Sequence, residues 1–129
     1  MGAMRVLVVE DNADAREMLQ VLLEMDGHDV LTAGDGLAAL REAERSRPDA
    51  ALIDIGLPGL DGCEVCRRLR QEPWGAAMFI VAQTGWGEDS DRQRSAEAGF
   101  DAHLTKPVDP QHLLDVLARR RPGGDASPR

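Results

Sequence analysis

The pattern that most constrains this chain is a five-fold alternation between short apolar runs and longer amphipathic segments. The apolar runs lie at 4–9, 28–32, 50–53, 77–82 and 100–104. Several of them are continuous rather than alternating, which is typical of strands covered on both faces. Strands that alternate with helices favour right-handed crossovers and a parallel sheet with helices on both sides. The alternation therefore predicts an α/β fold with a doubly wound, five-stranded parallel sheet.

The segments between the apolar runs carry helix signals. Apolar residues recur every three or four positions, with Met18 and Leu37 among them, and predict helices around 15–23, 37–43 and 65–69. A last helix is expected to begin with Asp109 as its N-cap and Pro110 at its first position. Three arginines at 119–121 then fall in its final turn, where cations are favourable.

Length and charge limit the classes of protein to consider. A chain of 129 residues fits one domain, which we place at 4–121, followed by a flexible tail at 122–129. The net charge of −8 argues against direct binding to nucleic acid or to an anionic membrane surface, because both require a basic face. No apolar run approaches the length of a membrane span, and no signal peptide is evident. We therefore expect a cytoplasmic protein.

Cys63 and Cys66 form a Cys-x-x-Cys pair at the start of a predicted helix. A helix N-terminus favours a thiolate, so a redox role is one interpretation. A structural zinc site would need two further ligands at close spacing, and the three histidines are scattered. The simpler interpretation, which we favour, is that both cysteines pack as small apolar residues.

Polar side chains follow four of the five predicted strands. Glu10 and Asp11 follow the first strand, Asp54 the third, Thr84 the fourth and Lys106 the fifth. In an open parallel sheet these ends lie at one edge, where ligands bind. Three carboxylates gathered there would repel one another unless a cation lay among them. Hard oxygen ligands at a partly open site suit Mg²⁺.

The same residues suit phosphoryl transfer. A carboxylate beside a metal is a competent nucleophile towards phosphorus, and the reaction needs mainly positioning and neutralisation of charge. Mg²⁺, Lys106 and Thr84 would each cover one phosphoryl oxygen. An Asp after a strand is by itself more often a helix N-cap than a nucleophile. The signal is the joint occurrence of all four groups, in order, on one edge.

Four short runs resemble the response-regulator receiver domain: VEDN at 9–12, DIGLPGLDG at 54–62, QTG at 83–85 and KP at 106–107. The resemblance covers about residues 4–120. It implies a flavodoxin-like fold with five helices and strand order 2-1-3-4-5, which places Asp11 next to Asp54.

The resemblance also implies roles for single residues. Asp54 would be the phosphoryl acceptor and, with Asp11, a direct ligand of Mg²⁺. Glu10 would act mostly through water, and the backbone carbonyl of Gly56 would complete the protein ligands. In the family, Pro58 and Gly62 match the loop that leads into the third helix.

Further roles fall on the fourth and fifth strands. Lys106 would pair with the phosphoryl group, and its bond to Pro107 is usually cis in the family. Thr84 would move to bond the phosphoryl group. His103 stands where the family usually has an aromatic switch residue, and its polarity makes a buried position less favourable. Trp86, two residues after Thr84, is a candidate shield of the phosphoryl group or an ordinary loop residue.

These features favour a phosphorylation-controlled signalling module rather than a turnover enzyme. A histidine kinase or a histidine phosphotransfer protein would donate the phosphoryl group. The polar segment 88–97, as a weakly anchored fourth helix, would form with the fifth strand and fifth helix the face that binds a downstream protein. The runs at 84–87 and 97–109 also resemble receivers attached to hybrid histidine kinases.

Two alternatives use the same fold or chemistry. A receiver-fold interaction module without phosphorylation would not need Asp11, Asp54, Thr84 and Lys106. An aspartyl-phosphate phosphatase needs a second acid two residues after its nucleophile, where this chain has Gly56.

Overall fold

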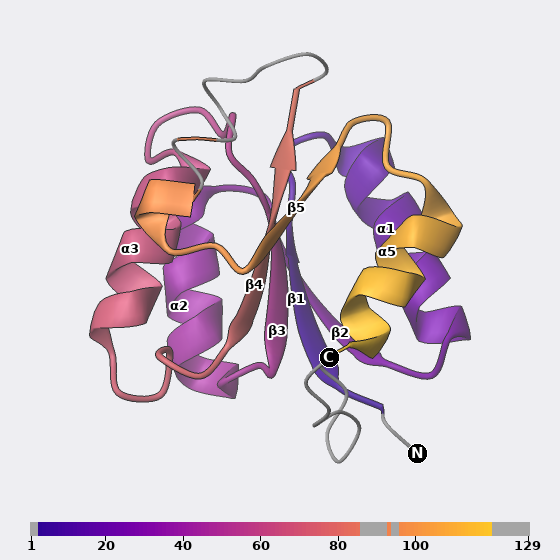
Figure 1. Ribbon diagram of the computed structural model, residues 1–129, viewed down its shortest axis with the longest axis horizontal. Helices are drawn as coiled ribbons and strands as arrows, with labels where there is room; N and C mark the ends of the chain where they lie inside the picture. The colour runs from indigo at the N-terminus through magenta and orange to yellow at the C-terminus, as the bar shows by residue number, and fades with distance from the viewer. Residues whose placement is uncertain (1–2, 86–92, 94–95, 120–129) are drawn as a thin grey trace.

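The computed structural model describes residues 3–85, 93 and 96–119. Five strands form one parallel sheet in the order β2-β1-β3-β4-β5, which confirms the predicted topology (Figure 1). The strands are β1 (Arg5–Val9), β2 (Asp29–Ala33), β3 (Ala50–Asp54), β4 (Phe79–Thr84) and β5 (Ala102–Thr105). The helices with defined bounds are α1 (Ala13–Met25), α2 (Gly36–Ser46), α3 (Gly62–Gln71) and α5 (Pro110–Ala118).

Helices cover both faces of the sheet, with α2 and α3 on one side and α1 and α5 on the other (Figure 1). Each face has its own apolar core. Val9, Ile53 and Ala82 point towards α2 and α3, where Leu69 packs against them. Alternate strand residues such as Leu52 build the second core with α1 and α5. Every residue of β3 and β4 is buried, and both strands are apolar up to their polar carboxyl ends, which is typical of strands covered on both faces.

Each described helix with defined bounds begins at a polar N-cap whose side chain accepts a backbone N–H three residues on. These caps are Asn12, Asp35, Asp61 and Asp109. The predicted role of Asp109 is thereby confirmed. The end of α5 differs from the prediction, because the helix stops at Ala118 and Arg119 is already its C-cap. Arg119 therefore lies just beyond the final helical turn, and the other two arginines of the run, 120 and 121, lie outside the described residues.

The apolar stripes on α1 and α2 are less buried than their spacing predicts. On α1 the fully buried contacts come from Leu19 and Leu23, whereas Met18 is 63% exposed. On α2, Leu37 belongs to the predicted apolar stripe but is 56% exposed. A helix that lies flat on a sheet contacts it with a narrow face, so the edges of a wide apolar stripe remain in solvent.

Three predictions lie outside the described residues in whole or in part: the tail at 122–129, the position of Trp86, and most of the helix expected at 88–97. Of that last segment the structure describes residues 93, 96 and 97, all helical. Within the described ranges, no helix is long and apolar enough to cross a membrane.

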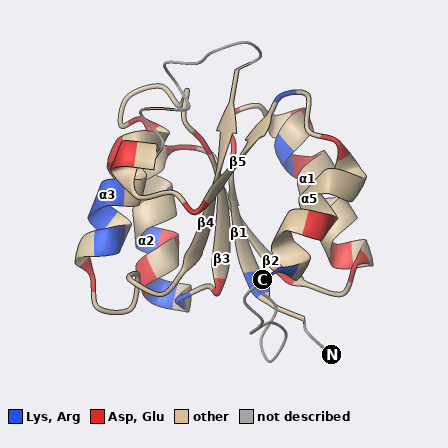
Figure 2. Cartoon of the chain, in the orientation of Figure 1, with Lys and Arg blue, Asp and Glu red and all other residues tan. Residues whose placement is uncertain are grey.

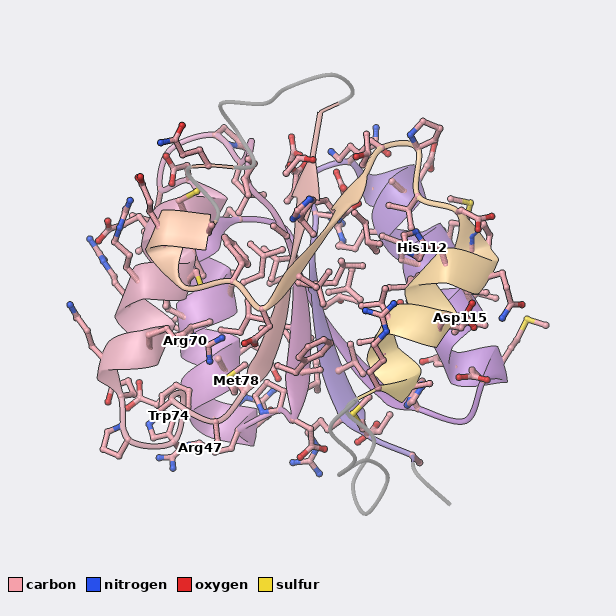
Figure 3. The ribbon with its side chains drawn as sticks, viewed as in Figure 1. Arg47, Arg70, Trp74, Met78, His112 and Asp115 are labelled. Carbon is pink, nitrogen blue, oxygen red and sulfur yellow. The ribbon has the colours of Figure 1, made fainter. Side chains whose placement is uncertain are left out.

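At the amino ends of the strands, acidic side chains are matched by donors. The Arg5 side chain lies 3.4 Å from Asp29, and the Arg5 backbone N–H donates to Asp49 at 2.9 Å. Arg70 on α3 bonds the carbonyl oxygen of Met78 at 2.7 Å (Figure 3). It also bonds the Asp101 carboxylate at 2.7 Å. Asp101 in turn accepts the N–H of Ile80 at the start of β4 (2.8 Å). Figure 2 shows basic residues gathered along α3, which supplies this arginine.

Candidate functional site

Three carboxylates meet at the carboxyl ends of β1 and β3. One carboxylate oxygen from each of Glu10, Asp11 and Asp54 lies within 4.8 Å of the other two. The predicted gathering of these acids therefore occurs in the structure. Glu10 and Asp54 are buried, and Asp11 is exposed. Two carboxylates thus come from the protein interior and one from the rim, which leaves the site open on one side.

Both oxygens of the Asp54 carboxylate have a donor. The backbone N–H of Gly56 donates to Oδ1 at 2.8 Å, and the Lys106 ammonium donates to Oδ2 at 2.6 Å. Lys106 also lies 3.6 Å from Glu10 Oε1. Burial by itself lowers the pKa of Lys106, but the hydrogen bond and charge of Asp54, with the charges of Glu10 and Asp11, outweigh it. The pKa of Lys106 is therefore raised, and the side chain is an ammonium.

Glu10 is held from two sides. The backbone N–H of Asn12 donates to Glu10 Oε2 at 3.1 Å, while the Asn12 side chain caps α1. The Arg16 guanidinium donates to the backbone carbonyl of Glu10 at 2.8 Å. Arg16 was not among the predicted site residues. The signal that could have found it is its position one helical turn beyond the N-cap, on the helix that follows the acidic pair.

The loop after β3 is packed tightly against the acceptor strand. Gly62 opens α3, and a Cβ at this position would overlap the backbone carbonyl oxygen of Asp54. The N–H of Gly62 bonds the carbonyl oxygen of Ile55 at 3.3 Å. Only glycine allows this approach, which gives a physical reason for the Gly62 of the motif.

Thr84 and His103 lie on the face of the sheet that α2 and α3 cover. Ala82 belongs to the core on that face, and alternation along β4 places Thr84 on the same side. His103 pairs in register with Ala82 and is half-buried. The Thr84 hydroxyl is buried and donates to the Leu104 carbonyl at 3.4 Å. The two predicted switch residues are thus brought to one face of neighbouring strands.

The Lys106–Pro107 peptide bond is cis, as the resemblance implies. Gln83 belongs to the QTG run of the resemblance but was assigned no role from the sequence; it is buried near the end of β4 and pairs in register with Asp54. Its Nε2 has no hydrogen-bond partner among the described residues.

Cys63 and Cys66 are both buried in the core between the sheet and α2 and α3. Burial raises the pKa of the Cys66 thiol to about 12, so the helix N-terminus does not produce a thiolate there at neutral pH. This supports the interpretation of the pair as packing residues.

The arrangement suits a divalent cation and a phosphoryl group. The carboxylate oxygens of the site are hard donors, and one side of the site is open. The net charge of the site is negative, because among the described residues three carboxylates face a single ammonium, that of Lys106. Such a donor set favours Mg²⁺, which keeps several waters and takes one or two carboxylates. The Asp54 carboxylate belongs to the acidic cluster and also contacts the Lys106 ammonium, and phosphoryl transfer depends mainly on such positioning and neutralisation of charge.

Several known proteins are similar to this chain in sequence. A 14.6 kDa protein of Leptolyngbya boryana is 37% identical over 91% of this chain and 89% of its own length. The alkaline phosphatase synthesis transcriptional regulatory protein PhoP of Bacillus subtilis is 42% identical over 84% of this chain. The chain spans only 45% of PhoP, and about half of the similar DNA-binding response regulators.

The solved structure of the receiver domain of sensor histidine kinase PA1611 from Pseudomonas aeruginosa is 35% identical, with a TM-score of 0.85. The match covers 92% of this chain and 97% of that domain, whose active-site cleft holds a magnesium ion. The family model of the response regulator receiver domain matches residues 6–118. The chain therefore belongs to the response regulator receiver domain family.

Proposed function

We propose that Asp54 accepts a phosphoryl group from a phosphohistidine donor in the presence of Mg²⁺, and that this changes which proteins bind the chain. Receiver domains are phospho-acceptor signalling modules that histidine kinases phosphorylate. The observation that carries the assignment to Asp54 is its environment. It is buried at a strand end, bonded by Gly56 and Lys106, and in reach of Glu10 and Asp11.

The transfer is a substitution at phosphorus. An oxygen of the Asp54 carboxylate forms the new O–P bond while the N–P bond to the donor imidazole breaks, and the imidazole nitrogen keeps the electron pair and takes up a proton. The Lys106 ammonium, which bonds the carboxylate in the resting state, would then move to a phosphoryl oxygen. The Thr84 hydroxyl would bond another. These movements neutralise charge without covalent work by the protein.

We expect Mg²⁺ to be held by Asp11 and Asp54 directly, by Glu10 through water and by the carbonyl oxygen of Gly56. The close approach of the three carboxylates supports this assignment, as does the magnesium ion in the Pseudomonas aeruginosa receiver. Bound there, the ion would neutralise charge on the phosphoryl group.

For the output, we propose the face formed by the segment 88–97, β5 and α5. His103 on β5 would transmit the movement of Thr84, because both lie on one face of adjacent strands. The donor would be a histidine kinase or a histidine phosphotransfer protein, and a receiver attached to a hybrid histidine kinase would use the same chemistry. We place the domain at 4–121 and expect it to act in the cytoplasm.

The proposal is tested by incubating the protein with acetyl phosphate and Mg²⁺ and measuring its intact mass. The wild type should gain one phosphoryl group, and EDTA should prevent the gain. Asp54→Asn, which keeps the side-chain size, should stay unmodified. A phosphoryl gain in Asp54→Asn equal to that of the wild type would refute the assignment of the acceptor.

A further inference from the structure

A buried amide occupies the strand position just before Thr84. Gln83 is 2% exposed, and its Nε2 is unpaired within the described part of the chain. Buried polar atoms in folded proteins are paired in the large majority of cases, because an unpaired one loses its bonds to water without replacement. An apolar residue would fill the same space at lower cost. The amide therefore indicates a state in which its donor is used.

Gln83 lies directly beside the proposed acceptor. Its Cα pairs in register with that of Asp54, and its carbonyl accepts the Ile55 N–H at 3.1 Å. Two residues earlier on these strands, Val81 and Leu52 both belong to the core under α1 and α5. Because side chains alternate along a strand, Gln83 and Asp54 share that same face.

The ion pair between Lys106 and Asp54 has to cross β4. Asp54 ends β3 and Lys106 follows β5, and β4 lies between these two strands in the sheet. The residue of β4 that pairs in register with both Asp54 and Leu104 is Gln83. Neighbouring strands are about 4.8 Å apart, a distance that a glutamine side chain covers. The carboxamide is therefore within reach of the group that Lys106 now holds.

We propose that Gln83 is a positioning residue that stabilises the phosphorylated state by donating a hydrogen bond to the Asp54 acyl group. The inference rests on the proposed function, because it requires Lys106 to leave the Asp54 carboxylate for the phosphoryl oxygens. In the resting state the ammonium bonds Oδ2, and the Gln83 donor is unused. After transfer, the carboxamide replaces the donor that Asp54 has lost. No proton moves and no bond of Gln83 breaks.

The test compares the wild type with Gln83→Met, which keeps the length of the side chain and removes the donor. Beryllofluoride with Mg²⁺ serves as the probe of the phosphorylated state, and its affinity is measured by calorimetry. We expect binding to weaken about five-fold, the value of one ordinary hydrogen bond. The Tm of the variant without ligand should equal or exceed that of the wild type, and its affinity for Mg²⁺ alone should not change.

The matched control is Gln111→Met, the same change at an exposed glutamine of α5, which should bind beryllofluoride as the wild type does. Gln83→Leu provides a second apolar replacement, and we expect the same weakening. Unchanged beryllofluoride affinity in both Gln83 variants would overturn the inference, and so would an equal loss of affinity for Mg²⁺ alone. A wild type that binds Mg²⁺ but no beryllofluoride would instead overturn the proposed function, and this inference with it.

Discussion

The two ends of the sheet differ in how their acidic side chains are arranged. At the amino ends, the acids Asp29, Asp49 and Asp101 each lie against an arginine side chain or a backbone donor. At the carboxyl ends, Glu10, Asp11 and Asp54 crowd within 4.8 Å, and Lys106 contacts two of them. At the amino ends the acids lie apart and two arginine side chains neutralise Asp29 and Asp101, whereas at the carboxyl ends three adjacent carboxylates share the Lys106 ammonium.

This difference indicates that the acids at the amino ends contribute to stability, whereas those at the carboxyl ends serve function. A matched acid contributes to folding, because its partner offsets the cost of desolvation. Crowded carboxylates repel one another and oppose folding, so their arrangement is explained by a ligand that carries positive charge. Substitutions at the amino end should therefore change the free energy of unfolding and leave phosphorylation intact. Substitutions of the three acids at the carboxyl end should impair phosphorylation and leave the free energy of unfolding unchanged or higher.

The largest effect is expected at the rim of the acidic cluster. Asp11→Ala should lower the rate of phosphorylation by acetyl phosphate at least about hundred-fold, because a charged metal ligand is lost. Without metal, the variant should unfold at the same or a higher urea concentration, since repulsion is relieved. Asp29→Ala is the matched control at the opposite end and should be phosphorylated normally. A normal rate in Asp11→Ala would contradict the metal assignment.

The next effect is on stability at the amino end. Arg70 donates to Asp101 and to the carbonyl oxygens of Met78 and Gly99, so Arg70→Met removes three hydrogen bonds that join α3 to the start of β4 and to the segment before β5. We expect the free energy of unfolding to fall by about 3 kcal/mol, measured by urea denaturation. Below the denaturation transition, the phosphorylation rate should be that of the wild type. Loss of phosphorylation in the fully folded variant would break the separation between the two ends.

A smaller effect is expected from Lys106→Met. Removing the ammonium takes away a charge that repels Mg²⁺, so the affinity for Mg²⁺ should rise roughly ten-fold. Phosphorylation should nevertheless fail to switch partner binding, because no cation follows the phosphoryl group. Fluorescence or calorimetric titration of Mg²⁺ measures the first effect. Weaker Mg²⁺ binding in the variant would show that Lys106 supports the metal site rather than opposing it.

The pH dependence of this pair has a defined sign. The pKa of Lys106 is raised in the folded protein, after the opposing effect of burial is outweighed by Asp54. Its contribution to folding is then fully present below the ordinary lysine pKa of about 10.4 and is lost as pH rises through the raised value. The stability difference between wild type and Lys106→Met should be constant near neutrality and should change as the pH rises through that alkaline range.

The smallest effect is expected for Asp49→Ala. This change removes one acceptor of the Arg5 backbone N–H and should lower the free energy of unfolding by about 1 kcal/mol. The phosphorylation rate measured with acetyl phosphate should not change. A loss larger than that of Arg70→Met would reverse the order proposed for the amino end.

The sequence was informative where the signal is local or where several residues share one strand edge. The apolar runs located β3 and β4 because both are buried along their whole length. The polar residues that follow the strands located the site, since the ends of parallel strands meet at one edge. The strand order, by contrast, came from the resemblance to receivers.

Other features depend on contacts between distant residues and leave no local pattern. Arg70 and Asp101 meet across 31 positions of the chain, and Gln83 lies beside Asp54 only because of the register between β3 and β4. The exposure of Met18 likewise depends on how flat α1 lies on the sheet, which spacing alone does not fix.

The central claim is that, among three adjacent carboxylates, Asp54 receives the phosphoryl group. Its most direct test is to phosphorylate the wild type with acetyl phosphate and Mg²⁺, reduce the acyl phosphate with borohydride, and locate the reduced residue by peptide mass spectrometry. The account predicts conversion of Asp54 to homoserine, with Glu10 and Asp11 unchanged. Reduction at Glu10 or Asp11, with Asp54 recovered intact, would contradict it.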